Sequence, residues 1–172
     1  MTVTYQHLVG DYENTDKVIA WNLENLWESL YTNDITPLFQ NGTDEPDYKA
    51  QFDMTGPNSI LINTLERNYE NTEDEVNSDT IHSVYEEIVI TIVAESRDMR
   101  IKLEDEVNRI LWELNVNSSN RITKSDGSSN SHIDHFSKSE VSFLQIDLED
   151  DETQFLQGSE GILTVVYYKF RS

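Results

Sequence analysis

The strongest constraint on the fold is a run of apolar, mostly β-branched residues within residues 81–94, IHSVYEEIVITIVA. β-branched side chains are restricted at χ1 and favour the pleated backbone of a strand. Ile88–Val93 is apolar at every position except Thr91, so both faces of this strand are expected to be covered. The run therefore predicts a strand in the centre of a sheet.

Three further segments have the alternation or composition of strands. Residues 59–70, SILINTLERNYE, alternate in polarity, and residues 71–80, NTEDEVNSDT, are acidic and lack periodicity. Two long strands joined by a polar turn form an antiparallel hairpin. A closing strand is predicted over residues 161–171, GILTVVYYKFR, and residues 140–148, EVSFLQIDL, also alternate.

Two segments have the apolar spacing of amphipathic helices. Residues 15–31 carry apolar side chains at intervals of three and four, and Asn14 or Thr15 can accept the first unpaired N–H groups as an N-cap. Residues 96–114 repeat the pattern, with Ser96 as the predicted N-cap. The two predicted stripes are Ile19, Leu23, Leu26, Trp27, Leu30 and Tyr31, and Met99, Leu103, Val107, Ile110 or Leu111, and Leu114.

The order of these elements predicts one α+β domain over residues 1–172, a length that suits a single core. We expect a mixed or antiparallel sheet of four to five strands, with two helices packed on one face. Residues 40–58 contain the Gly and Pro punctuation of a loop insertion. Residues 117–139 are rich in Ser and Asn, which predicts a long flexible connection with one short strand at Arg121–Lys124.

The charge of the chain is its most extreme compositional feature. Asp and Glu number 33 and Lys and Arg only 12, which gives a formal charge of −21. A surface of this sign repels nucleic-acid phosphate and anionic lipid, and this argues against binding of DNA, RNA or membranes through a basic patch. The charge fits a protein that works in concentrated salt, one that lines a passage for DNA, or one that imitates DNA. Scarce lysine and acidic residues spread along the chain favour the salt explanation.

Cysteine and long apolar segments are both missing from the sequence. A chain without cysteine forms no disulfide and supplies no thiolate to a metal or a substrate. No apolar run approaches the ~20 residues of a membrane span, and residues 1–14 have no basic-then-apolar signal region. We therefore expect a protein outside the membrane and the secretory route.

Few residues have the spacing of a chemical site. His132 and His135 flank Asp134 at a metal-like spacing, but no fourth ligand is in view, and the polar context predicts a solvated loop without a metal. The sequence contains no nucleophile elbow, phosphate-binding glycine loop or zinc-protease motif. We predict no catalytic residue and no cofactor, and hence a protein that is not an enzyme.

Two acidic runs and two tryptophans remain as candidates for interaction. The acidic runs lack the alternating ligands and glycine of a calcium loop. Trp21 and Trp112 fall off their helix stripes, and an aromatic on the wrong side of a helix indicates a protein interface. The candidates for interface or channel lumen are Trp21, Trp112, Glu73, Asp74, Glu75, Glu149, Asp150, Asp151 and Glu152.

The order of elements resembles that of the small neck and tail-completion proteins of tailed viruses, particularly the tail-terminator type. The segments that carry the resemblance are IAWNLENLWESLY, ILINTLERNYE with YEEIVITIVAES, RDMRIKLEDEVNRILWEL and GILTVVYYKFRS. It covers residues 15–172 by pattern and includes no catalytic signature. The loop at 40–58 and the acidity depart from the bacteriophage pattern, and acidity with scarce lysine is similar to proteins of viruses of salt-loving archaea.

The resemblance implies a mechanical role in the virion. Such a protein forms a six-fold ring that caps the tail tube, joins it to the capsid connector and lines the passage of the genome. Its partners would be further copies of itself, the tail tube protein, the head–tail connector proteins and passing DNA that it does not bind specifically. It would reside in the head–tail neck, and in the host cytoplasm during assembly. Three alternatives remain: an acidic DNA mimic that inhibits a basic nucleic-acid-binding protein, an enzyme with an unrecognised carboxylate site, and a halophilic interaction domain of another role.

Overall fold

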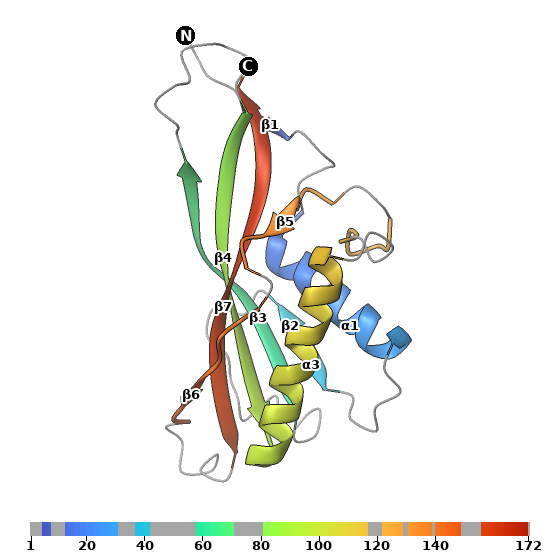
Figure 1. Ribbon diagram of the computed structural model, residues 1–172, viewed down its shortest axis with the longest axis vertical. Helices are drawn as coiled ribbons and strands as arrows, with labels where there is room; N and C mark the ends of the chain where they lie inside the picture. The colour runs from blue at the N-terminus through green and yellow to red at the C-terminus, as the bar shows by residue number, and fades with distance from the viewer. Residues whose placement is uncertain are drawn as a thin grey trace.

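Two helices pack on one face of a long twisted sheet in the computed structural model, so the fold is α+β, as the sequence predicts (Figure 1). The two helices are α1 (Thr15–Leu30) and α3 (Arg97–Val116). The structure describes residues 5–7, 13–30, 37–41, 58–70, 81–116, 122–128, 131–138, 140–148 and 156–171.

The sheet contains seven described strands in five positions. They are β1 (Tyr5–His7), β2 (Leu38–Asn41), β3 (Ser59–Glu70), β4 (Ile81–Ala94), β5 (His135–Phe136), β6 (Leu144–Ile146) and β7 (Gln157–Arg171). The order across the sheet is β1-β7-β4-β3-β2, and β5 and β6 also pair with β7. Because β4 fills one edge of β7 along its length, β1, β5 and β6 follow one another along the other edge. The sheet is mixed, since β2 runs parallel to β3.

The predicted hairpin forms the middle of this sheet. β3 pairs antiparallel with β4 from Ser59 opposite Val93, and the register shifts at a bulge between Thr64 and Glu66. β7 pairs along the other edge of β4, so β4 is the central strand that its apolar run predicts.

The main core lies between the helices and the face of the sheet that they cover. Ile88, Ile90 and Ile92 on alternate positions of β4 are fully buried in one cluster with residues of both predicted helix stripes. These are Ile19, Leu23, Leu26 and Trp27 of α1 and Leu103, Val107, Ile110, Leu111 and Leu114 of α3. Complete burial of a side chain of this size contributes about 1.5–3 kcal/mol relative to exposure. Ser96 caps α3 as predicted, because the Met99 N–H donates to its hydroxyl over 3.2 Å.

The opposite face of the sheet, here called the open face, is only partly covered. Near one end, Leu61, Val93 and Leu156 form a small second cluster. In the middle, Leu65 and Ile162 are 57% and 51% exposed. The prediction that β4 is covered on both faces is therefore wrong for this middle part, because both helices pack on the other side.

The predicted strand at Arg121–Lys124 is not present in its described part, residues 122–124. The chain instead makes a turn in which the Lys124 N–H donates to Ser128 O and the Gly127 N–H donates to Lys124 O. Gly127 has a φ of 81°, a left-handed conformation that side chains disfavour, and this explains the glycine here.

The predicted strand over residues 140–148 is reduced to the three residues of β6. Asn108 on α3 accepts from the Val141 N–H over 2.7 Å and donates to the Val141 carbonyl over 2.9 Å. These two bonds hold the segment before β6 beside the helix, and the Val141 side chain enters the main core at 3% exposure. A helix side chain thus replaces the neighbouring strand as the hydrogen-bond partner of this backbone.

Candidate functional site: a groove on the open sheet face

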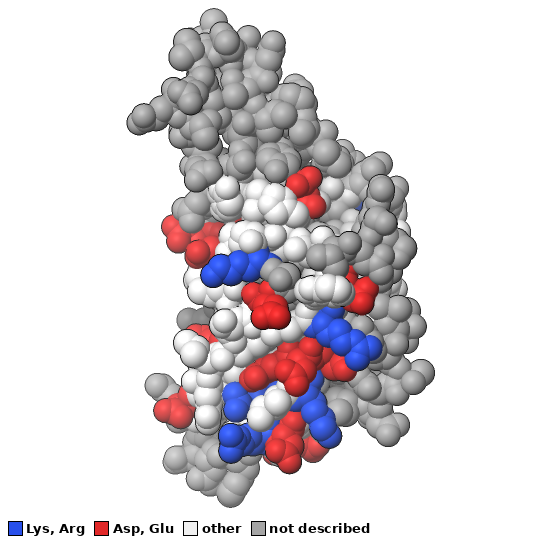
Figure 2. Space-filling model, in the orientation of Figure 1, with Lys and Arg blue, Asp and Glu red and all other residues white. Residues whose placement is uncertain are grey.

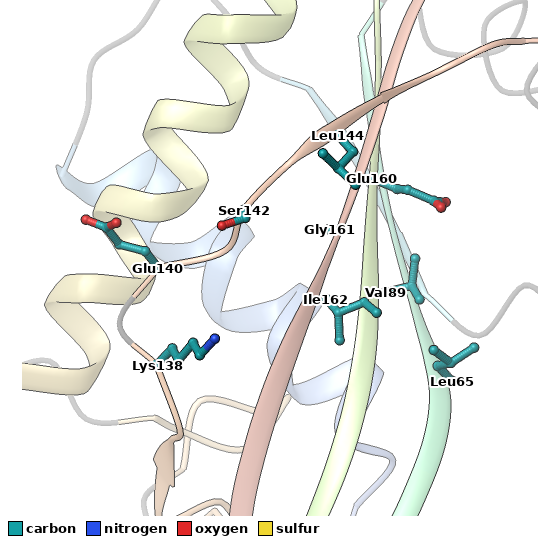
Figure 3. Close-up of a pocket in the computed structure, with 9 residues that line it drawn as sticks. All are labelled: Leu65, Val89, Lys138, Glu140, Ser142, Leu144, Glu160, Gly161 and Ile162. Carbon is teal, nitrogen blue, oxygen red and sulfur yellow. The ribbon is translucent and has the colours of Figure 1, made fainter.

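A groove of about 480 Å³ lies on the open face in the middle of the sheet. Its floor is formed by Leu65 of β3, Val89 of β4 and Ile162 of β7, which are neighbours across three strands (Figure 3). Val89 lies directly opposite Ile162, and Leu65 occupies the bulge of β3. The floor is therefore apolar and belongs to the most regular part of the fold.

The rim of the groove comes from the edge of β7 and from the segment between β5 and β6. Leu144 of β6 opposes Glu160 of β7, and both line the groove. Lys138 and Glu140 lie on the segment that leaves the sheet edge. In Figure 3 the Lys138 amine is directed toward the sheet, whereas the Glu140 carboxylate points away from it.

Gly161 allows this segment to pass close to β7. A Cβ atom at Gly161 would overlap the Val141 Cγ1 atom and lie 2.9 Å from the Ser142 carbonyl oxygen. The glycine is thus required by the close approach of another part of the chain, which both fills the core with Val141 and builds the rim of the groove.

Exposed large hydrophobic side chains are concentrated at this groove. Among the described residues five such side chains are exposed, and Leu65, Leu144 and Ile162 of the groove are three of them, Leu144 being 73% exposed. Single exposed hydrophobics are common on protein surfaces, but a contiguous patch indicates an interaction site. The groove is therefore a candidate surface for association with another apolar surface.

The other two exposed hydrophobic side chains lie on α3. Ile101 and Trp112 are 39% and 49% exposed. They are eleven positions, or about three helical turns, apart and so lie on one side of the helix. This side, here called the α3 stripe, comprises Ile101, Asp105, Asn108 and Trp112, and Asp105 on it is exposed. The exposure of Trp112 agrees with its position outside the apolar set predicted to face the core, which is Met99, Leu103, Val107, Ile110 or Leu111, and Leu114.

The charge of α3 differs from that of the rest of the chain. The helix holds four of the 12 basic residues and five of the 33 acidic residues, so its formal charge is −1 and that of the other 152 residues is −20. Arg100 contacts Glu104 at 3.0 Å, and Arg109 contacts Glu106 at 3.6 Å. Basic and acidic side chains are accordingly intermixed over this region of the surface (Figure 2). Of the surfaces that the structure describes, α3 is one that a second acidic molecule can approach with little repulsion.

Trp21, the other predicted interface tryptophan, is partly covered by its own chain. A Cβ atom at Gly127 would lie 3.5 Å from the indole Cζ2 atom, so the turn of residues 122–128 packs against the ring. Asn22 holds this turn, because it accepts from the Thr123 N–H over 3.0 Å and donates to the Thr123 carbonyl over 2.8 Å. Packing against this turn therefore explains why the Trp21 ring is partly covered. A role of Trp21 in an interface stays a prediction.

Glu13 fastens the same turn to the start of α1. Its carboxylate accepts from the Ser125 hydroxyl and from the Ser125 N–H, the latter over 3.0 Å, and it contacts the Lys17 amine at 3.5 Å. Partial burial raises the pKa of Glu13, but the hydrogen bonds from Ser125 and the positive charge of Lys17 outweigh this and leave the pKa below its ordinary value.

The histidines do not form a metal site among the described residues, where no group of three potential ligands is found. His132 is only 2% exposed, and its Nε2 lies 2.9 Å from the Thr15 hydroxyl. Its ring packs edge-to-face on Tyr167 with centroids 5.1 Å apart. The prediction of a solvated loop is therefore wrong for His132, which is buried and contacts Thr15 of α1 and Tyr167 of β7. His135 lies at the surface, with its Nδ1 2.6 Å from Asp134.

The predicted acidic residues Glu73, Asp74, Glu75, Glu149, Asp150, Asp151 and Glu152 lie outside the described residues. The strands that flank them are described. Ile81 pairs with Phe170 and Ala94 pairs with Gln157, so the ends of β4 and β7 next to the two runs are at opposite ends of one ladder. A ladder of this length measures about 43 Å.

Comparison with known proteins does not place the chain in a family. No family model matches it, and no curated protein matches its sequence. Among the described residues, no helix is both long and apolar enough to span a membrane. The groove, the α3 stripe and the order of the elements are therefore the features that bear on function.

Sequence reasoning did not predict the groove. One signal was present: the predicted strands are apolar on both faces, while only two helices were available, both expected on one face. One apolar face of the predicted sheet was therefore left without a covering element. Leu65, Val89 and Ile162 lie on that face.

Proposed function

We propose that this protein is a structural subunit of the head–tail neck of a tailed virus, a tail-terminator or tail-completion protein that associates into a ring. The observation that carries the proposal is the apolar groove on the open face of the sheet, in the middle of the described strands. A surface of this kind is suited to association with another protein surface.

The arrangement of the elements supports the same proposal. The segments that carry the resemblance form α1, the β3–β4 hairpin, α3 and the last strand β7, and β7 pairs with β4. Among the described residues the helices pack on one face of the sheet, which leaves the middle of the other face for a neighbouring subunit. The ring would cap the tail tube and join it to the capsid connector.

The charge of −21 supports a protein past which DNA moves without adhesion, because phosphate finds little opposite charge there. Scarce lysine supports a virus of a salt-loving archaeon as the source. Both explanations of the charge are compatible with the same ring.

The proposal is tested by the mass and location of the assembled protein. Size-exclusion chromatography with light scattering, at 0.1 M and 2 M KCl, should give a closed oligomer that electron microscopy shows as a ring. Antibodies should label purified particles at the junction of head and tail. A protein that is absent from particles, or that forms a tight one-to-one complex with a basic nucleic-acid-binding protein at low salt, would be the DNA mimic of the alternative hypothesis. Against that alternative, Glu104 and Glu106 on α3 are paired with Arg100 and Arg109.

A further inference from the structure

We propose that the α3 stripe of one copy docks into the sheet groove of the next copy, so that the contact joining subunits is head-to-tail. The inference rests on the proposed function and specifies which two surfaces meet in the ring.

The distribution of exposed apolar side chains supports this pairing. Each of the five large hydrophobic side chains exposed in the described residues belongs either to the groove or to the α3 stripe. Contact between the two surfaces would bury all five at once. Trp112, an aromatic residue with a polar indole N–H, is the type of anchor that is enriched at the centre of interfaces.

The two surfaces match in extent. The groove reaches from β3 across β4 and β7 to β6, a width of about 14 Å at the usual strand spacing. Ile101 and Trp112 are separated by about 16 Å along the helix axis. A helix that lies diagonally across the strands therefore brings both side chains over the apolar floor.

Each of the two surfaces carries charges of both signs, so opposite charges can be paired across the contact. Among the described residues that line the groove, the charged ones are Glu140, Glu160 and Lys138, and the Glu140 carboxylate points away from the sheet whereas the Lys138 amine points toward it (Figure 3). Along α3 the exposed basic residues Lys102 and Arg109 lie beside the stripe, and the exposed acidic residue Asp105 lies on it. Two copies of charge −21 repel one another, so a contact is favoured where cations of one copy meet acids of the next.

The geometry also determines the type of assembly. α3 packs on the covered face of the sheet, whereas the groove lies on the open face, so a copy that donates its helix keeps its groove free for a further copy. Such a contact is heterologous, and it closes into a ring when the rotation per subunit allows. An isologous dimer would use only one of the two surfaces.

The absence of cysteine from the sequence makes a direct test possible, because every thiol is then an introduced one. The variants are Trp112→Cys, Ile162→Cys and, as a control on the exposed side of α1, Asn25→Cys. Each is treated with a short bis-maleimide linker in 2 M KCl, alone and in pairwise mixtures. We expect the Trp112→Cys and Ile162→Cys mixture to give a cross-linked dimer at least tenfold above any pair that includes Asn25→Cys. The double variant should give a ladder that ends at the size of the ring.

Several results would overturn the inference. Cross-linking of Trp112→Cys with itself alone would show contact between helices, and that of Ile162→Cys with itself alone would show contact between grooves. Protection of Ile162→Cys from maleimide in dilute monomer would show that the chain covers its own groove. Cross-linking of the mixture no greater than that of the Asn25→Cys control would exclude the contact.

The test separates this inference from the proposed function. Antibody labelling of the neck together with no specific cross-link would refute the pairing of surfaces and leave the ring proposal standing. A specific cross-link in a protein absent from viral particles would refute the neck role and retain the interface.

Discussion

Replacement of Gly161 by alanine should destabilise the protein and disturb the rim of the groove. The added Cβ would overlap Val141 Cγ1 and lie 2.9 Å from the Ser142 carbonyl oxygen. Because the second of these atoms is backbone, the whole segment before β6 must move, not just one side chain. The movement pulls Val141 from the core and strains its two hydrogen bonds with Asn108.

The expected magnitude follows from these contacts. A local shift that leaves Val141 in place has the cost of an overpacked core, about 1–3 kcal/mol. Complete expulsion loses about 1.5–3 kcal/mol of apolar burial and about 0.5–1.5 kcal/mol for each of the two hydrogen bonds. Alanine also reduces the conformational entropy of the unfolded chain, which offsets the loss of stability by about 0.4–1 kcal/mol. We expect a loss of about 3 kcal/mol, or about 6–12 °C in Tm for a chain of this size.

The assay is urea unfolding at fixed KCl, with the free energy of unfolding compared at unchanged m-value. Gly158→Ala is the matched control, because its Cβ would meet side-chain atoms of Ile146 and Leu148 at 2.9 and 3.1 Å, and partly exposed side chains can rotate away. We expect the control to cost less than about 1 kcal/mol.

A double-mutant cycle examines the proposed clash itself. Val141→Ala removes the Cγ1 atom that the new Cβ would overlap, so the two substitutions together should be less destabilising than their sum by about 1 kcal/mol or more. Additive effects, or a Gly161→Ala protein as stable as the control, would refute the close-approach argument.

Three further predictions follow from the charges and from the turn that covers Trp21. Raising KCl from 0.1 M to 2 M should raise Tm in a thermal scan, because screening weakens the self-repulsion of a −21 chain; a Tm that falls monotonically with KCl would contradict this. Glu13 has a lowered pKa, so its stabilisation is present above the ordinary value of 4.5 and is lost as the pH falls through the folded-state pKa. Glu13→Gln should therefore destabilise at neutral pH and match the wild type at the acid end of a pH–stability series, whereas a constant difference would be inconsistent with linkage. Asn22→Ala removes the amide that holds the Thr123 backbone and should cost about 2–3 kcal/mol, with faster amide hydrogen exchange at Thr123; unchanged exchange would show that the turn holds without this amide.

Val89 belongs both to the central strand, which the sequence predicts, and to the groove, which it does not. The apolar run of β4 correctly predicted a central strand, and the prediction that both of its faces are covered was wrong around Val89. A sequence pattern shows that an apolar face needs a partner, but it does not show whether that partner is the same chain. The structure shows that the two helices cover only the other face.

Local sequence patterns were sufficient to predict α1, the β3–β4 hairpin, α3 and the closing strand β7. Periods of 3.6 and 2 residues report which side of an element is apolar, and neighbouring residues are sufficient to specify them. Two features depend on the folded chain as a whole. His132 is buried beside Thr15, 117 positions away, and the Val141 backbone is hydrogen-bonded to the Asn108 side chain and not to a strand. These contacts join single residues that are distant in the chain, so no repeating pattern marks them, and they form only once the helices have packed on the sheet.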